Sequence, residues 1–161
     1  MQDKPLVIIT GATSGIGKQT AVRFAEAGHP LLLLGRDTAK LNDLNFEHAM
    51  VKEVDVTDID AFKQAIAEAE AKYGEADALL NVAGVMLLGD IADQDHKQWQ
   101  TMVNVNIVGV LNGMQAVLPG MRARKRGTIM NVSSIAGIKP FPLHAAYTGT
   151  KFAVHGLTDN V

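Results

Sequence analysis

Tyr147 and Lys151, a tyrosine and a lysine four residues apart, are the pair in this sequence with the clearest capacity for chemistry. If the segment is helical, their spacing puts the phenol and the ammonium one turn apart on one face. A positive charge at about 5 Å, in a medium of effective dielectric about 20, favours the phenolate by about 3 kcal/mol. The pair could then serve as a general acid or base. The same spacing also occurs between side chains on solvated helix faces, so the pair alone does not establish a function.

A glycine-rich segment near the start of the chain points to phosphate binding. Residues 6–10 form a short apolar, β-branched run typical of a strand buried on both faces. Gly11, Gly15 and Gly17 follow, and apolar residues then recur at helical spacing. In such a unit glycines let the backbone approach a ligand, and the free N–H groups at the helix start attract phosphate. The spacing is GxxxGxG rather than the commoner GxGxxG, and a tight connection without a ligand is the alternative.

These motifs resemble those of the short-chain dehydrogenase/reductase family. The resemblance runs from about residue 5 to residue 161, and five motifs occur in the family's order and spacing: Thr10 to Gly17, Asn81-Val82-Ala83-Gly84, Asn106, Ser134, and Tyr147 with Lys151. It implies an α/β fold with a doubly wound parallel sheet, the Rossmann fold. It also implies reversible hydride transfer between a nicotinamide dinucleotide and a small-molecule carbonyl or secondary alcohol.

The resemblance also assigns the catalytic roles. Tyr147 is the general acid in carbonyl reduction and the general base in alcohol oxidation, and Lys151 favours its phenolate and holds the nicotinamide ribose. Ser134 orients the substrate oxygen; Ser133 is less favoured because only Ser134 has the family's spacing to Tyr147. Asn106 is expected to position a water behind Lys151 for proton exchange.

Two of these positions have a competing interpretation. Asn104 is the alternative to Asn106, which is preferred because the residues that follow it match the family pattern. The family motif at Asn81 normally has a second asparagine where this chain has Val82. The valine lacks the polar side chain that is expected to hold the central sheet together. Contact between the backbone of this segment and the cofactor is still expected.

NADP(H) is favoured over NAD(H) because Gly35 stands where an NAD-binding member places a carboxylate, and Arg36 follows it. Asp37 is the counterargument, since it could reach a ribose hydroxyl instead of capping the next helix. The cofactor-binding residues expected from the resemblance are Gly11, Thr13, Ser14, Gly15, Ile16, Gly17, Arg36, Asp55, Val56, Asn81, Ala83, Gly84, Tyr147 and Lys151.

Composition restricts the remaining classes of function. The 161 residues are 47% hydrophobic, with a formal charge of −2, which is typical of one globular domain and gives no sign of a nucleic-acid or membrane partner. Unbroken apolar runs are too short to cross a bilayer, and a cytoplasmic location is the default expectation. The chain has no cysteine, and its histidines lack metal-ligand spacing, so no metal is expected. The basic run at residues 122–126 is interpreted as the end of a helix.

Alternating apolar runs and helical patterns predict strands at residues 5–10, 30–35, 49–55, 78–82 and 127–132. They predict helices at residues 16–27, 38–44, 58–73, 95–124 and from 145 onward. Residues 103–107 alternate as a strand would, but their flank and the family resemblance favour a helix. The loop at residues 138–144, with residues 85–87, is expected to form a wall of the substrate pocket.

The chain is expected to be a single domain over residues 1–161 and part of a longer polypeptide, because family members continue beyond the lysine. A homodimer or homotetramer is expected through the long helix and the tyrosine helix. Residues 85–89 and 116–121 resemble members that act on small hydroxy acids, or on β-keto or aldehyde groups. A dinucleotide-binding or redox-sensing module without turnover is the alternative function, although such a module has no need for Ser134, Tyr147 and Lys151 together.

Overall fold

Strands buried on both faces form the centre of the molecule. The computed structural model describes residues 4–161, in which all of β1 (Leu6–Thr10) and the four leucines of β2 (Leu31–Gly35) are buried. With β3 (Ala49–Glu53), β4 (Ala76–Asn81) and β5 (Thr128–Asn131) they form a five-stranded sheet in the order β3-β2-β1-β4-β5. Every neighbouring pair is parallel, so the expected doubly wound sheet is confirmed.

Alternate residues of the central strands face opposite layers of helices. Leu6 and Ile8 of β1 pack in a cluster with α3 (Ile59–Tyr73) and α5 (Gly109–Arg124). Val7 and Ile9 pack instead with α1 (Gly15–Glu26) and α2 (Thr38–Asn42). Burying both faces needs apolar residues at consecutive positions, which explains the unbroken apolar runs in the sequence.

The segment from residue 96 to residue 124 is one continuous helix with a wide turn in its middle. It consists of α4 (His96–Val103), a π-helical turn η1 (Asn104–Val108) and α5. The preference for a helix over a strand at residues 103–107 is therefore confirmed. By length and composition this helix could cross a membrane, contrary to the expectation from unbroken apolar runs. It packs against β4 and α3, however, as a core helix does.

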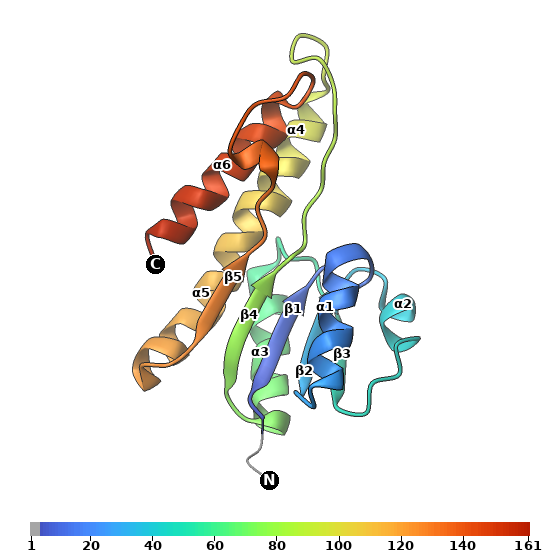
Figure 1. Ribbon diagram of the computed structural model, residues 1–161, viewed down its shortest axis with the longest axis vertical. Coiled ribbons are helices and arrows are strands. Elements are labelled where there is room, and N and C mark those ends of the chain that lie inside the picture. The colour runs from blue at the N-terminus through green and yellow to red at the C-terminus, as the bar shows by residue number, and fades with distance from the viewer. Residues whose placement is uncertain (1–3) are drawn as a thin grey trace.

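The carboxyl ends of the strands all lie at the end of the sheet where α1 begins, which is the upper end in Figure 1. A short 3-10 turn, η2 (Ile135–Gly137), leads from β5 towards α6 (Ala145–Asp159). Helix α6 contacts η2, α4 and the π turn. The tyrosine helix and the long helix thus come together above the end of the sheet. Each predicted element is present, with ends that differ by at most two residues.

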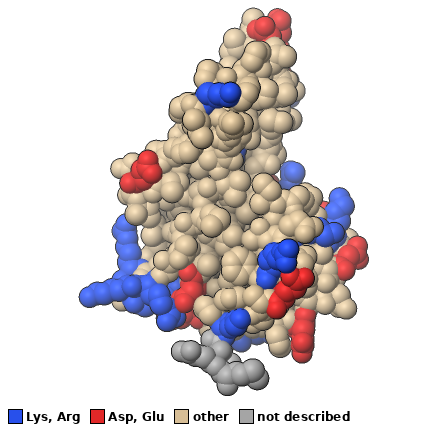
Figure 2. All heavy atoms as spheres, viewed as in Figure 1, with Lys and Arg blue, Asp and Glu red and all other residues tan. Residues whose placement is uncertain are grey.

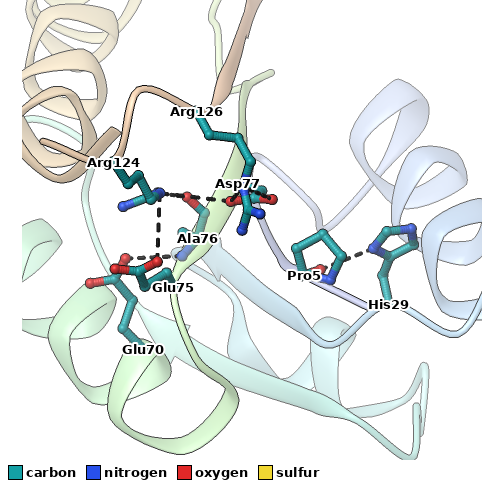
Figure 3. A network of polar contacts seen from close by, with 8 residues as sticks. All are labelled: Pro5, His29, Glu70, Glu75, Ala76, Asp77, Arg124 and Arg126. Carbon is teal, nitrogen blue, oxygen red and sulfur yellow. Dashed lines mark hydrogen bonds and ion pairs between the residues drawn. The ribbon is translucent and has the colours of Figure 1, made fainter. Parts of the chain in front are cut away.

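The basic run at residues 122–126 lies at the opposite end of the sheet. Arg126 pairs with Asp77 at 2.9 Å, and Arg124 lies 3.7 Å from the same carboxylate and donates to the carbonyl of Ala76. These contacts join the end of α5 to the start of β4 (Figure 3). On the face shown in Figure 2, charges of both signs gather around the lower part, and the upper part is largely uncharged.

Candidate active site

A cavity of about 390 Å³ lies at the carboxyl ends of the strands. It is formed by the β1–α1 turn, the ends of β2 and β3, and the segment that follows β4. The predicted cofactor-binding residues that line it are Gly11, Thr13, Ser14, Gly15, Ile16, Gly17, Arg36, Asp55, Val56, Ala83 and Gly84. Residues far apart in the sequence are therefore brought together. Asn81, Tyr147 and Lys151 are outside this lining.

The glycine turn leaves no room for side chains on its inner side. A Cβ atom at Gly11 would lie 2.8 Å from the backbone of Ala83, and a Cβ atom at Gly17 would lie 2.3 Å from the carbonyl oxygen of Gly11. Gly11 also has a φ of +66°, which favours glycine. The turn, the segment after β4 and the first turn of α1 can pack this closely because these positions are glycines.

The first turn of α1 is suited to bind an anion. The helix begins at Gly15, beside the cavity, and its first turn contains no acidic residue. Within residues 4–161, the N-cap Ser14 makes no side-chain hydrogen bond to the helix. The N–H groups of this turn are thus free of capping by Ser14, and the positive end of the helix dipole lies at the cavity. These features fit the pyrophosphate of a dinucleotide.

The end of β2 places a glycine, Gly35, and then a cation, Arg36, at the cavity. Arg36 is exposed and lines the cavity. A Cβ atom at Gly35 would lie 2.8 Å from the γ-methyl carbon of Thr13, so a larger side chain there would displace Thr13. Asp37 caps α2 and lies 3.0 Å from the ammonium of Lys40, and hydrogen bonding to Lys40 lowers the pKa of Asp37.

Asp55 lines the same cavity as the glycine turn and lies two residues after the end of β3. Its carboxylate accepts hydrogen bonds from the backbone N–H of Thr57 at 2.9 Å and from the Thr57 hydroxyl at 2.7 Å. The backbone bond, then the hydroxyl bond, lowers the pKa of Asp55, and the charge of Arg36 adds to this effect. Both hydrogen bonds use the same carboxylate oxygen. Because its pKa is lowered, Asp55 is ionised beside the cavity.

Hydrogen bonds join the end of β4 to β1 and β5, although Val82 stands where the family motif has a second asparagine. The Thr10 hydroxyl accepts hydrogen bonds from the N–H groups of Val82 and Ala83, at 3.0 and 3.1 Å. The Asn81 side chain donates to the Asn131 side chain at 2.9 Å and is buried. Thr10 and Asn81 therefore join β4 to β1 and β5 at the position where Val82 lacks a polar group.

Asn106 lies in the π turn and is almost fully buried, with 1% of its surface exposed. Its side-chain oxygen accepts from the N–H of Val85 at 2.8 Å, and its amide donates to the Val85 carbonyl at 2.9 Å and to the Thr150 hydroxyl at 3.0 Å. Both amide hydrogens are engaged. Asn104, the competing candidate, instead accepts a hydrogen bond from Gln100.

Ser133 and Ser134 follow β5 and make different hydrogen bonds. Ser133 donates its hydroxyl proton to the carbonyl of Lys151 at 3.1 Å, which ties the end of β5 to α6. The Ser134 oxygen accepts from the N–H of Ala136 at 3.1 Å. This bond uses a lone pair and not the proton, so the Ser134 hydroxyl can still donate to a substrate oxygen.

Lys151 and Tyr147 lie one turn apart on α6, as their spacing requires. The Lys151 ammonium is 5.8 Å from the centre of the Tyr147 ring and donates to the carbonyl of Val132 at 2.9 Å. The residue is 5% exposed, and burial lowers its pKa. A Cβ atom at Gly84 would lie 3.5 Å from this ammonium, so Lys151 borders the cavity that Gly84 lines.

The loop before α6 places an imidazole beside the tyrosine. The His144 ring lies 6.3 Å from the Tyr147 ring, centre to centre, and His144 Nδ1 is 2.6 Å from the carbonyl oxygen of Pro142. The N–H of Gly89 donates to the carbonyl of Leu143 at 3.1 Å. The segment after β4 and the loop at residues 138–144 are therefore in direct contact.

Two hydroxyl groups at the site were not predicted from the sequence. Thr10 holds the segment after β4 against β1, and Thr150 accepts a hydrogen bond from Asn106. Thr10 could have been inferred from its place between a buried strand and the glycine turn. Thr150 carries no such signal, because its partner is 44 residues away in the sequence.

Comparison with known proteins identifies the family. The sequence pattern of the short chain dehydrogenases matches residues 5–161. An uncharacterized oxidoreductase of Listeria monocytogenes is 40% identical over 160 residues, which cover 96% of this chain and 64% of that protein. The chain thus spans about 64% of the length of this curated relative.

Solved structures agree in fold. A short-chain dehydrogenase from Streptomyces avermitilis superposes with a TM-score of 0.93 at 30% identity, covering 99% of this chain and 60% of that one. The closed form of a serine dehydrogenase complexed with NADP⁺ gives a TM-score of 0.92 at 32% identity, covering 96% of this chain and 64% of that one. The Rossmann fold and the family resemblance are confirmed. This chain belongs to the short-chain dehydrogenase family.

Proposed function

We propose that this chain carries the dinucleotide-binding and catalytic part of an NADP(H)-dependent oxidoreductase that interconverts a small-molecule carbonyl and a secondary alcohol. The observation that carries this proposal is the position of Lys151. A buried ammonium lies one helical turn from Tyr147 and beside a cavity whose glycine turn and helix N-terminus suit a pyrophosphate.

Tyr147 is the proposed acid or base. The ammonium of Lys151 lies 5.8 Å from the centre of the Tyr147 ring, and its hydrogen bond to the carbonyl of Val132 keeps the charge in place at the end of β5. In carbonyl reduction Tyr147 would give its proton to the substrate oxygen, and in alcohol oxidation it would take one up. When bound, the nicotinamide would supply or accept the hydride.

Ser134 is the proposed donor that orients the substrate oxygen. Its own oxygen is fixed by the N–H of Ala136, which leaves the hydroxyl proton available at the start of the 3-10 turn. A donor held in this way needs little reorganisation when charge develops on the substrate oxygen. Ser133 lacks this freedom because its proton is bonded to the carbonyl of Lys151.

Asn106 contributes mainly by holding other groups in place. Its amide joins the Val85 segment to α6, so the side chain has little capacity left for a water. A water for proton exchange behind Lys151 would therefore use the second lone pair of the Asn106 side-chain oxygen or a backbone carbonyl of the π turn.

NADP(H) is the proposed cofactor. Three features support it: Arg36 is exposed at the cavity, Gly35 supplies no carboxylate at the end of β2, and Asp37 is already paired with Lys40. Guanidinium groups bind phosphate through paired, charge-assisted hydrogen bonds. That the serine dehydrogenase relative was crystallised with NADP⁺ also supports this choice.

The proposal is tested by assaying the protein that carries this chain with NADPH and NADH against a panel of carbonyls, and with the oxidised dinucleotides against the matching alcohols. Turnover with at least one substrate, and a higher kcat/KM with NADPH than with NADH, is expected. Tight binding of dinucleotide without turnover of any substrate would favour the binding or sensing module instead.

A further inference from the structure

The hydroxyl of Thr150 lies where three parts of the site meet. It accepts a hydrogen bond from the Asn106 amide in the π turn, at 3.0 Å, and donates to the carbonyl of Tyr147 in its own helix, at 2.7 Å. Asn106 in turn holds both the N–H and the carbonyl of Val85, a residue that lines the cavity. A single chain of hydrogen bonds thus runs from the cavity wall to the backbone of Tyr147.

Only half of this arrangement is common in helices. A threonine hydroxyl often bonds to the carbonyl one turn earlier, with no further consequence. Here the same hydroxyl also receives the amide of a buried asparagine from another helix. Asn106 and Thr150 are 1% and 2% exposed, so water cannot replace a lost partner. Without this hydroxyl, one Asn106 donor would be buried and unpaired.

We propose that Thr150 is a positioning residue for catalysis. Its hydroxyl fixes the Tyr147 turn of α6 against the π turn and the Val85 segment, and so sets where the phenol and the Lys151 ammonium stand relative to the cavity. This inference rests on the proposed function. It makes Thr150 act through Asn106 and Tyr147, without contact with substrate or cofactor.

The position next to Lys151 explains why small shifts matter here. Tyr147 and Lys151 both belong to the helical turn that Thr150 bonds, and Lys151 is also tied to the carbonyl of Val132. Without the bond between Asn106 and Thr150, α6 keeps the bond from Lys151 to Val132 after β5 but loses this bond to the π turn. A displacement of about 1 Å can cost on the order of 100-fold in rate.

The test compares Thr150→Val with Thr150→Ser in the protein that carries this chain. Valine keeps the shape and removes the hydroxyl, whereas serine keeps the hydroxyl. We expect Thr150→Val to lower kcat by about 10- to 100-fold and to weaken NADPH binding by a smaller factor, and Thr150→Ser to retain most of the activity and of the NADPH affinity. If Thr150→Val does not fold, Thr150→Ala replaces it.

Thr148→Val is the matched control. It removes a hydroxyl from the same helix, and among residues 4–161 that hydroxyl is buried without a hydrogen-bond partner. Activity should be unchanged. Equal losses of activity in the two valine variants would show that removing any threonine hydroxyl from α6 is enough, and would contradict a specific role for Thr150.

A double-mutant cycle with Asn106→Ala shows whether Thr150 acts through Asn106. If so, the losses of kcat in Thr150→Val and Asn106→Ala are not additive, because the first change already disconnects the second residue. Wild-type kcat in Thr150→Val, equal losses in the serine and valine variants, or additive losses in the cycle would each overturn the inference.

Failure of the proposed function would be seen separately, as a wild-type protein with no NAD(P)-dependent turnover. The inference is then judged by the rise in melting temperature that NADPH causes. Thr150→Val should diminish this rise and Thr150→Ser should preserve it, whereas equal rises in the two variants would contradict the inference.

Discussion

Lys151 illustrates the conflict between function and stability at a single residue. A buried ammonium is poorly solvated, and burial lowers the pKa of Lys151 below its usual 10.5. The role proposed for Lys151 beside Tyr147 needs this charge, but burial disfavours the charged form in the folded protein. Stability given up at such a position is a common feature of active sites.

This conflict predicts how stability depends on pH. Between the lowered pKa of Lys151 and 10.5, the unfolded chain binds a proton that the folded chain does not. Stability of the wild type relative to Lys151→Met should therefore rise as pH rises through this window, and should level off below it. Melting temperatures of both proteins over this range test the prediction, with exposed Lys63→Met as the control. A difference that stays constant with pH would contradict it.

Arg36 is the residue on which the proposed choice of NADP(H) depends. Replacing it by leucine removes the proposed partner of the 2′-phosphate, and hydrogen bonds to charged groups contribute about 1.5 to 3 kcal/mol. Arg36→Leu should raise the KM for NADPH by about 10- to 100-fold and change the KM for NADH little. Arg23→Leu removes an equal charge that is 84% exposed and pairs with Glu26, so it serves as the control. Equal effects on both dinucleotides would count against the assignment.

At the scale of elements, the β1–α1 turn can pack closely against the start of α1 and the segment after β4 because glycines stand at the points of contact. Gly17→Ala would place a Cβ atom 2.3 Å from the carbonyl oxygen of Gly11. The turn must then open, which should destabilise the fold by about 1 to 3 kcal/mol and weaken NADPH binding.

Gly156→Ala provides a matched comparison in α6. A Cβ atom at Gly156 meets no atom of the described residues within 4 Å. Alanine should therefore stabilise this helix, by up to about 1 kcal/mol. Urea unfolding of both variants compares their stabilities, and NADPH titration compares their affinities for the dinucleotide. A Gly17→Ala protein that binds NADPH normally would show that the turn is not close-packed around the cofactor.

The elements could be predicted from the sequence because their signals are local. The apolar runs of β1 and β2 and the helical spacing of Tyr147 and Lys151 each lie within a few residues, and the helices and strands appeared where expected. The π turn at residues 104–108 gave no such signal: its alternating residues resembled a strand, and the wide turn became visible only in three dimensions.

Contacts between elements were harder to predict. Thr150 bonds to Asn106 across 44 residues, and Thr10 bonds to Val82 across 72, so the partner of each hydroxyl cannot be found from the residues near it in the sequence. The replacement of an expected asparagine by Val82 could be seen in the sequence. How Thr10 and Asn81 hold that part of the sheet could not, because it depends on which strands are neighbours.

At the scale of the whole molecule, the long helix and α6 expose apolar side chains. Val103, Val108 and Leu111 of the long helix are 37 to 41% exposed, and Phe152 of α6 is 46% exposed. Large apolar residues are exposed on the two helices that the family resemblance assigns to subunit pairing, which agrees with the homodimer or homotetramer expected from the sequence.

A charge in this surface should weaken association. Leu111→Glu is expected to shift the protein to smaller species in analytical ultracentrifugation, because a carboxylate would be buried without a partner in an apolar interface. Met86→Glu changes a similarly exposed apolar residue on the segment after β4 and should leave the oligomeric state as it is. An unchanged oligomeric state in Leu111→Glu would show that Leu111 does not lie in a subunit interface.

The proposed reaction depends on Tyr147 exchanging a proton with the substrate beside the charge of Lys151. Its most direct test is the turnover of Tyr147→Phe, measured with NADPH and a carbonyl substrate of the wild type together with the dissociation constant for NADPH. If Tyr147 is the acid or base, we expect a loss of kcat of about 100-fold or more with NADPH binding largely retained. Full turnover in Tyr147→Phe would contradict it.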